Sequence, residues 1–317
     1  MPAEYQLASL HPEMVALDAK RDRSLQPVYW CFRADERSLL HSFQLGDSRS
    51  LAVRDIQSAY GYGGPLSNSD DPRFLAAADL ALKQWAQDNA VVAEFLRFHP
   101  LVPHARWYAG TVARNRETVH IDLTGELFDQ YPTRRRTDIR RFTESGVRVE
   151  KVPPDVMRDS FPGLYKDNME RIGAAASYYF PADYFDALFR FEGSENWLAY
   201  AGDRAVAGAV VLVSAQAKIA EYHLGAKADG SDRLRATIGL LHLAASSYKA
   251  LCYRYFYLGG GRSVAADDSL LFFKKGFSPL TGQFQTGSRV YEPGRYAELK
   301  SMFPEKAATG RVLFYKD

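Results

Sequence analysis

The sequence predicts an α/β protein with mixed sheets, divided into two domains. With 317 residues, the chain is long enough for roughly two domains of ~100–200 residues each. Apolar residues make up 46% and charged residues 25%, which are ordinary values for a globular protein with a sizeable core. Helical and strand-like patterns follow one another without the strict alternation that a parallel sheet requires. We place the domain boundary before Pro153 and Pro154, giving residues 1–150 and 151–317.

The first predicted domain contains a loop too rich in glycine for regular structure, residues 57–72. The helix after this loop is amphipathic, because Phe74, Ala77, Ala81 and Trp85 recur at helical spacing. The predicted elements are, in order, a helix at 11–20, strands at 27–33, 39–45 and 51–56, a helix at 73–89, and strands at 91–98 and 118–123.

A strongly basic segment ends this domain. Residues 134–151 hold seven Lys or Arg and three Asp or Glu. A helix is expected to about residue 145, with Gly146 ending it before a strand at 147–152. Two interpretations stay open, a solvated helix face and a patch that contacts phosphates, since the planar guanidinium suits phosphate oxygens. The arginines concerned are Arg134, Arg135, Arg136, Arg140 and Arg141.

The second predicted domain begins with two helices. Pro162 is expected to kink or restart the first, and Pro181 suits the first turn of the second. Short polar turns join the next three strands as antiparallel hairpins. The predicted elements are helices at 155–172 and from 181, strands at 196–201, 205–213 and 217–225, a helix at 234–248, a strand at 253–258, a short helix at 269–275, strands at 280–284 and 288–291, and a terminal helix.

Residues 254–277 look like the corner at which a reaction takes place. An aromatic strand runs into Gly259, Gly260 and Gly261, which tolerate positive φ and close approach by a ligand. Asp267 and Asp268 are placed to cap the short helix that carries Lys274 and Lys275. Lys275 is assigned to solvent. Lys274, a cation among aromatic residues, is the candidate for chemistry.

Composition excludes several classes of protein. Cys31 and Cys252 lie far apart and are expected to be free thiols without metal-ligand spacing. No signal peptide, membrane-spanning stretch, catalytic-triad, zinc or Walker pattern is visible, so we expect a cytoplasmic protein that does not insert into a membrane and has no metal site. The net charge of +2 does not decide whether a polyanion binds.

The order of elements in the second domain resembles the Gcn5-related N-acetyltransferase (GNAT) fold, and the first domain resembles a worn copy of it. Several segments together resemble the FemAB family, whose members carry two such domains in one chain. These segments are residues 60–65 (YGYGGP), 97–101 (RFHPL), 134–150, 221–226 (EYHLGA), 258–261 (LGGG) and 269–278 (SLLFFKKGFS).

This resemblance implies transfer of an aminoacyl group from aminoacyl-tRNA, as co-substrate without a further cofactor, to the amine of a small molecule or peptide. In the family, the lysine that matches Lys274 stabilises the oxyanion formed on the attacked carbonyl, as a fixed cation should. Tyr222 is expected to orient the acyl group. The arginines of residues 134–141 are expected to meet tRNA phosphates. Further substrate contacts are expected from Phe273, Tyr60, Tyr62, Gly63, Arg97, His99, Tyr184, His223, Gly259, Gly260 and Arg262.

Other functions stay open. Phe180 stands where members that bind a nucleotide-linked cell-wall precursor have a basic residue, and no coiled-coil arm is inserted; both argue against a peptidoglycan precursor as acceptor. An acyl-CoA-dependent N-acyltransferase would need glycines in the turn at residues 229–239; Arg233 and Arg235 supply charge there, but the two glycines are missing. A binding protein without catalysis is the third alternative.

Overall fold

The computed structural model of the chain describes residues 1–263, 265 and 267–316. It divides into two compact units, Met1–Asn115 with Gln283–Asp317, and Arg116–Gly282. The sequence placed the boundary between residues 150 and 151, which lies inside strand β7 (Arg148–Val152) of the second unit. The last residues return to the first unit through tertiary contacts, which the sequence pattern does not show.

The first unit is built on the strand order β1-β2-β3-β5-β12. Its pairs are antiparallel except β3 with β5, and helix α2 makes the crossover between those two strands. Phe43, Ile56 and Leu96 form part of its core. The elements are α1 (Pro12–Asp18), β1 (Leu25–Ala34), β2 (Arg37–Ser48), β3 (Val53–Gln57), β4 (Leu66–Ser67), α2 (Pro72–Asp88), β5 (Val91–Phe98), β12 (Thr281–Val290), α9 (Pro293–Met302) and α10 (Pro304–Ala308).

The second unit is built on the strand order β6-β11-β10-β9-β8-β7. Only β10 and β11 run parallel, so this sheet is also mixed, as the sequence predicts. Its elements are β6 (Thr111–Asp122), α3 (Leu127–Gln130), α4 (Thr133–Glu144), β7, α5 (Pro154–Arg171), α6 (Ala182–Arg190), β8 (Ser194–Ala201), β9 (Arg204–Ser214), β10 (Ile219–Lys227), α7 (Ala236–Ala250), β11 (Tyr255–Gly260) and α8 (Ser269–Lys275).

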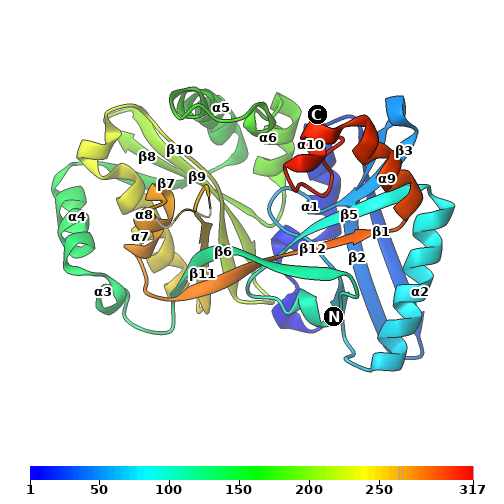
Figure 1. The fold of residues 1–317 in the computed structure, drawn as a ribbon. Coiled ribbons are helices and arrows are strands. Elements are labelled where there is room, and N and C mark those ends of the chain that lie inside the picture. The colour runs from blue at the N-terminus through cyan, green and yellow to red at the C-terminus, as the bar shows by residue number, and fades with distance from the viewer. Residues whose placement is uncertain (264, 266, 317) are drawn as a thin grey trace. The chain divides into compact units, whose positions relative to one another are not determined.

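Helices cover both faces of this second sheet, with α5 and α6 on one side and α4 and α7 on the other (Figure 1). The alternation of side chains along β8 shows why. Trp197 and Ala199 belong to the core that α7 completes, whereas Leu198 lies beside Gly208 and Phe161 of α5. A sheet with both faces buried needs apolar residues at successive positions, which β8 and β9 supply.

Three differences from the predicted elements have local causes. The two strands expected at 280–284 and 288–291 form one strand, β12, in which Gly287 makes room for the ring of Phe98 instead of a turn. Strand β6 begins at Thr111, seven residues before the predicted start. Helix α5 continues through Pro162 without a restart. Among helices made of described residues, none has the length and apolar character to cross a membrane.

Candidate active site

The parallel strands β10 and β11 separate after a short paired segment. Residues 219–221 of β10 lie opposite residues 255–257 of β11. From there β10 stays with β9 as far as Lys227, whereas β11 continues along β6. A register shift interrupts β10 between Tyr222 and Leu224, and such bulges re-aim side chains beside active sites. The part of β10 that is not paired with β11 therefore begins at Tyr222.

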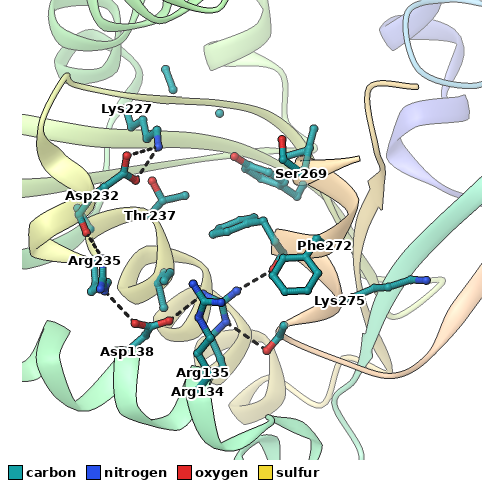
Figure 2. Close-up of a pocket in the computed structure, with 18 of the residues that line it drawn as sticks. Arg134, Arg135, Asp138, Lys227, Asp232, Arg235, Thr237, Ser269, Phe272 and Lys275 are labelled. Atoms are coloured by element: carbon teal, nitrogen blue, oxygen red, sulfur yellow. Dashed lines mark hydrogen bonds and ion pairs between the residues drawn. The ribbon is translucent and has the colours of Figure 1, made fainter. Parts of the chain in front are cut away.

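A cavity of about 740 Å³ lies in the second unit beside this separated part of β10 (Figure 2). Its walls come from β10, the start of α7, parts of α4 and α5, and helix α8. Its volume falls within the ~300–1,000 Å³ of small-molecule sites, and most of its lining is apolar, as is usual for them. The apolar lining residues are Ile172, Ala226, Ala236, Ile238, Leu270, Phe272 and Phe273.

Lys274 is buried beside this cavity, with only 7% of its surface exposed. Its Nζ donates a hydrogen bond to the carbonyl oxygen of Gly260 at 2.7 Å and lies 5.9 Å from the ring centroid of Tyr222. No described carboxylate forms an ion pair with it. Burial lowers the pKa of Lys274 to about 7, against the weaker opposing effect of the Asp268 charge. The side chain therefore exists as ammonium and as amine near neutral pH.

Tyr222 forms the cavity wall in front of Lys274. Its hydroxyl makes no hydrogen bond with any residue that the structure describes. The ring lies across Gly225, where a Cβ atom would come within 1.7 Å of the hydroxyl oxygen. Burial raises the pKa of Tyr222 to about 12, so the hydroxyl stays protonated and can donate to a ligand. Gly225 is thus required by the position of this ring.

The three glycines at the end of β11, Gly259, Gly260 and Gly261, are needed for the local fold. Gly259 has φ of +78°, where L side chains are strained. A Cβ on Gly260 would lie 2.9 Å from the backbone oxygen of Glu117, and one on Gly261 would collide with the carboxylate of Asp268. That carboxylate accepts hydrogen bonds from the backbone amides of Arg262, Ser263 and Leu271, which lower its pKa to about 2. Asp268 caps α8 and fixes the turn that brings Lys274 under Gly260.

The first turn of α7 borders the cavity through Ala236, Thr237 and Ile238. Its N-cap, Arg235, has a left-handed backbone with φ of 55°, and no side chain caps the helix. Uncapped amides at a helix N-terminus favour an anion. Gly239 is needed for packing, because a Cβ there would overlap the ring of Phe142.

Ion pairs engage most of the charge around the cavity (Figure 2). Lys227 binds both carboxylate oxygens of Asp232, at 2.6 and 2.7 Å. The Nε of Arg235 lies 2.9 Å from Asp138. Lys275 is exposed, as the sequence predicts, and pairs with Glu117 at 2.7 Å. Two lining arginines, Arg134 and Arg262, have no side-chain partner among the described residues.

The arginines of α4 divide between the interior and the surface. Arg135 was expected on a phosphate-facing patch, but its guanidinium is buried and donates to the carbonyl oxygens of Phe273 and Gly276 at the end of α8. Arg136 donates to the carbonyl oxygen of Tyr131. Arg134, Arg140 and Arg141 are exposed. The exposed patch is therefore smaller than the sequence indicates.

Tyr184 and His223 lie on the other face of β10. The Tyr184 hydroxyl on α6 is 3.3 Å from Nε2 of His223, so His223 points away from the side that carries Tyr222. Phe180, at the place of the family's basic residue, is buried with its ring centroid 4.6 Å from that of Tyr184. This position is filled by aromatic packing, which leaves no charge for a diphosphate.

The predicted residues of the glycine-rich loop and of strand β5 come together within the first unit. The Gly63 amide donates to the Arg97 carbonyl oxygen at 2.8 Å, and the ring centroids of Tyr62 and His99 are 4.6 Å apart. His99 is fully buried, and its Nδ1 accepts from the backbone amide of Leu101. The guanidinium of Arg21 lies over the ring of Tyr60. These contacts connect the loop to the strand end.

Sequence reasoning missed the carboxylates Asp138 and Asp232 and the cavity lining by Thr237, Ser269 and Phe272. One signal was available, since Arg135 and Asp138 stand three residues apart on a helix. Pairing of Asp138 with Arg235, 97 positions along the chain, depends on how α4 packs against α7.

No family model and no curated protein matches this chain. Solved structures are similar. FemX has a TM-score of 0.68 at 12% identity, covering 94% of this chain and 96% of that chain. L-PGS from Bacillus licheniformis has 0.60 at 12%, covering 96% and 98%. A tandem GNAT protein from the clavulanic acid biosynthesis pathway has 0.50 at 12%, covering 92% and 98%. The likeness to the tandem GNAT protein and to FemX confirms the predicted fold, a mixed α/β chain with two tandem GNAT-like domains.

Proposed function

We propose that the chain is an acyltransferase that forms an amide bond, moving an aminoacyl group from aminoacyl-tRNA to the amine of a small molecule or peptide. The observation that carries this proposal is the pairing of Tyr222 and Lys274 at the cavity where β10 and β11 separate. Tyr222 lines the cavity, its protonated hydroxyl has no hydrogen-bond partner among the described residues, and the buried Lys274 lies against its ring. The shared fold with FemX is consistent with such chemistry.

The reaction needs charge stabilisation more than a dedicated base. The acceptor nitrogen attacks the ester carbonyl, a C–N bond forms, and the carbonyl oxygen becomes an oxyanion. The Tyr222 hydroxyl donates to that oxygen, and the ammonium form of Lys274 stabilises the charge through the ring of Tyr222. The C–O bond then breaks, and the proton released by the amine goes to the leaving ribose oxygen, so atoms and charge balance.

Phosphate contacts would come from two places. Arg134 and Arg262 line the cavity without side-chain partners among the described residues, and the uncapped first turn of α7 also borders it. These groups suit the last phosphodiester of a tRNA 3′ end. Arg140 and Arg141, exposed farther along α4, suit phosphates outside the cavity. With a tRNA substrate, the enzyme would act in the cytoplasm, and it would need no cofactor besides this co-substrate.

A second candidate is an acyl-CoA-dependent N-acyltransferase. It is favoured by the same uncapped α7 turn, because backbone amides at a helix start can hold a pyrophosphate. Against it, the sequence lacks the glycines that usually let a pyrophosphate approach such a turn.

Donor discrimination tests the proposal. Purified protein is incubated with charged tRNA or with acyl-CoA, together with candidate amines, and amide products are identified by mass spectrometry. The Tyr222→Phe variant is the matched control, since it removes one hydroxyl and keeps the ring above Gly225. Product from charged tRNA alone supports the proposal, product from acyl-CoA alone supports the second candidate, and no product from either leaves a binding protein.

A further inference from the structure

The charges that line the cavity favour one class of acyl group. Six cationic side chains and two carboxylates form part of its wall. Both carboxylates are engaged, Asp138 by Arg235 and Asp232 by Lys227. Arg134 and Arg262, which have no side-chain partner among the described residues, add only positive charge. Within the described part of the wall, therefore, both carboxylates already have a cationic partner and positive charge is in excess.

The surroundings of Tyr222 also disfavour a positively charged group on the ligand. Apolar side chains such as Ala226, Leu270 and Phe273 line the cavity with Tyr222. Lys274 lies against its ring and forms no ion pair with a carboxylate in the described part of the chain. An ammonium group placed there would lose its hydration and approach another cation. Both effects disfavour the charged form of an amine.

We infer that the cavity selects donors whose acyl side chain carries no positive charge, and that it discriminates against lysyl and arginyl groups. This inference rests on the proposed function. The donor's own α-amino group is compatible with this inference. Its ordinary pKa of roughly 7.7–8.0 means that binding as the neutral amine lowers the affinity by about tenfold or less near pH 7. A lysyl side chain has an ordinary pKa of roughly 10.4, so binding as the neutral amine would lower the affinity by a factor of about 10³.

Binding of unreactive donor analogues tests this inference separately from turnover. The probes are adenosine 5′-phosphates that carry the acyl group on a 3′-amide: norleucyl, lysyl and Nε-acetyl-lysyl. Norleucyl matches the lysyl chain without its charge, and Nε-acetyl-lysyl controls for length. Calorimetry should give a Kd for lysyl at least about 10²-fold weaker than for norleucyl at pH 7, with the difference shrinking towards pH 9. The Nε-acetyl-lysyl probe should bind within about tenfold of norleucyl.

A charge placed on the wall provides the matched variant. Phe272 is 68% exposed on α8 and lines the cavity, so its replacement should leave the fold intact. Phe272→Glu should strengthen lysyl binding about tenfold relative to norleucyl, and Phe272→Gln should not. Equal effects of the two variants, lysyl binding within threefold of norleucyl, or failure of every probe to bind would each overturn the inference. A preference for the norleucyl over the lysyl probe without amide formation would instead contradict only the proposed function.

Discussion

Replacing Lys274 by Met should stabilise the protein at neutral pH, although it removes a group that we place in catalysis. In the unfolded chain this lysine has its ordinary pKa of 10.5, and in the folded chain burial lowers the pKa to about 7. Between these two values the unfolded state binds more protons, so stability should rise with pH from 7 to 10.5. Below pH 7 the cost of burying Lys274 is complete. Methionine is similar in shape and takes up no proton.

The magnitude follows from about 1.4 kcal/mol for each pH unit. At pH 7, where about half of the folded molecules still carry the proton, the lysine costs about 4 kcal/mol, and at pH 9 about 2 kcal/mol. The substitution also leaves the Gly260 carbonyl without its donor, which costs roughly 1–3 kcal/mol at both pH values. Lys274→Met should therefore stabilise the protein by about 1–3 kcal/mol at pH 7 and close to nothing at pH 9. The change between the two pH values, about 2 kcal/mol, does not depend on the lost hydrogen bond.

Urea unfolding with a hydrogen–deuterium pulse at fixed pH can measure this difference in peptides of the second unit, whatever the first unit does. Lys275→Met is the matched control, because Lys275 is exposed on the same helix and paired with Glu117. It should change stability by less than about 1 kcal/mol, equally at both pH values. If the effect of Lys274→Met differed by less than about 1 kcal/mol between pH 7 and pH 9, Lys274 would have an ordinary pKa and our account of its environment would be refuted.

Three further predictions concern the same unit. Tyr222→Phe should lower kcat by ~10–10³-fold without changing the urea midpoint, because the lost hydroxyl has no partner among described residues; an unchanged kcat would remove it from the mechanism. Arg135→Met should destabilise the unit by about 2–4 kcal/mol in the same urea assay, since it frees two carbonyl oxygens at the end of α8. Arg140→Gln with Arg141→Gln should lower the slope of log affinity for charged tRNA against log salt by up to ~1.4, measured by filter binding; an unchanged slope would exclude both from phosphate contact.

Most of the fold could be predicted from the sequence, because the spacing of apolar residues indicates which faces of the helices and strands are buried. Strand β9, for example, is apolar at nearly every position, since helices cover both faces of its sheet. The irregular order of helices and strands sufficed to exclude a parallel sheet. The return of residues 283–317 to the first unit was not accessible, because it depends on pairing of β12 with β5 about 190 positions away.

The candidate site was accessible only in part. Capping of α8 by Asp268 has a local signature and was predicted correctly. The glycines at 259–261 were singled out for positive φ and for close approach by a ligand. Gly259 has a positive φ, whereas Gly260 and Gly261 lie against the Glu117 backbone and the Asp268 carboxylate. The inward turn of Arg135 could not be predicted, since the carbonyls that it meets lie about 140 positions along the chain. Local signals report caps and turns, while charge pairing within a site depends on tertiary packing.

The position of Lys274 is itself evidence for a function of this corner. If its role were only to satisfy the Gly260 carbonyl, a neutral donor would do so without the cost of burying a charge. The charge of Asp268 acts on Lys274, yet that carboxylate is engaged by backbone amides of the preceding turn and of the start of α8. Among the described residues, the lysine thus has no ion-pair partner, and it lies against the ring of Tyr222, which lines the cavity. A group that destabilises the fold and titrates near neutrality is expected where a reaction uses its charge.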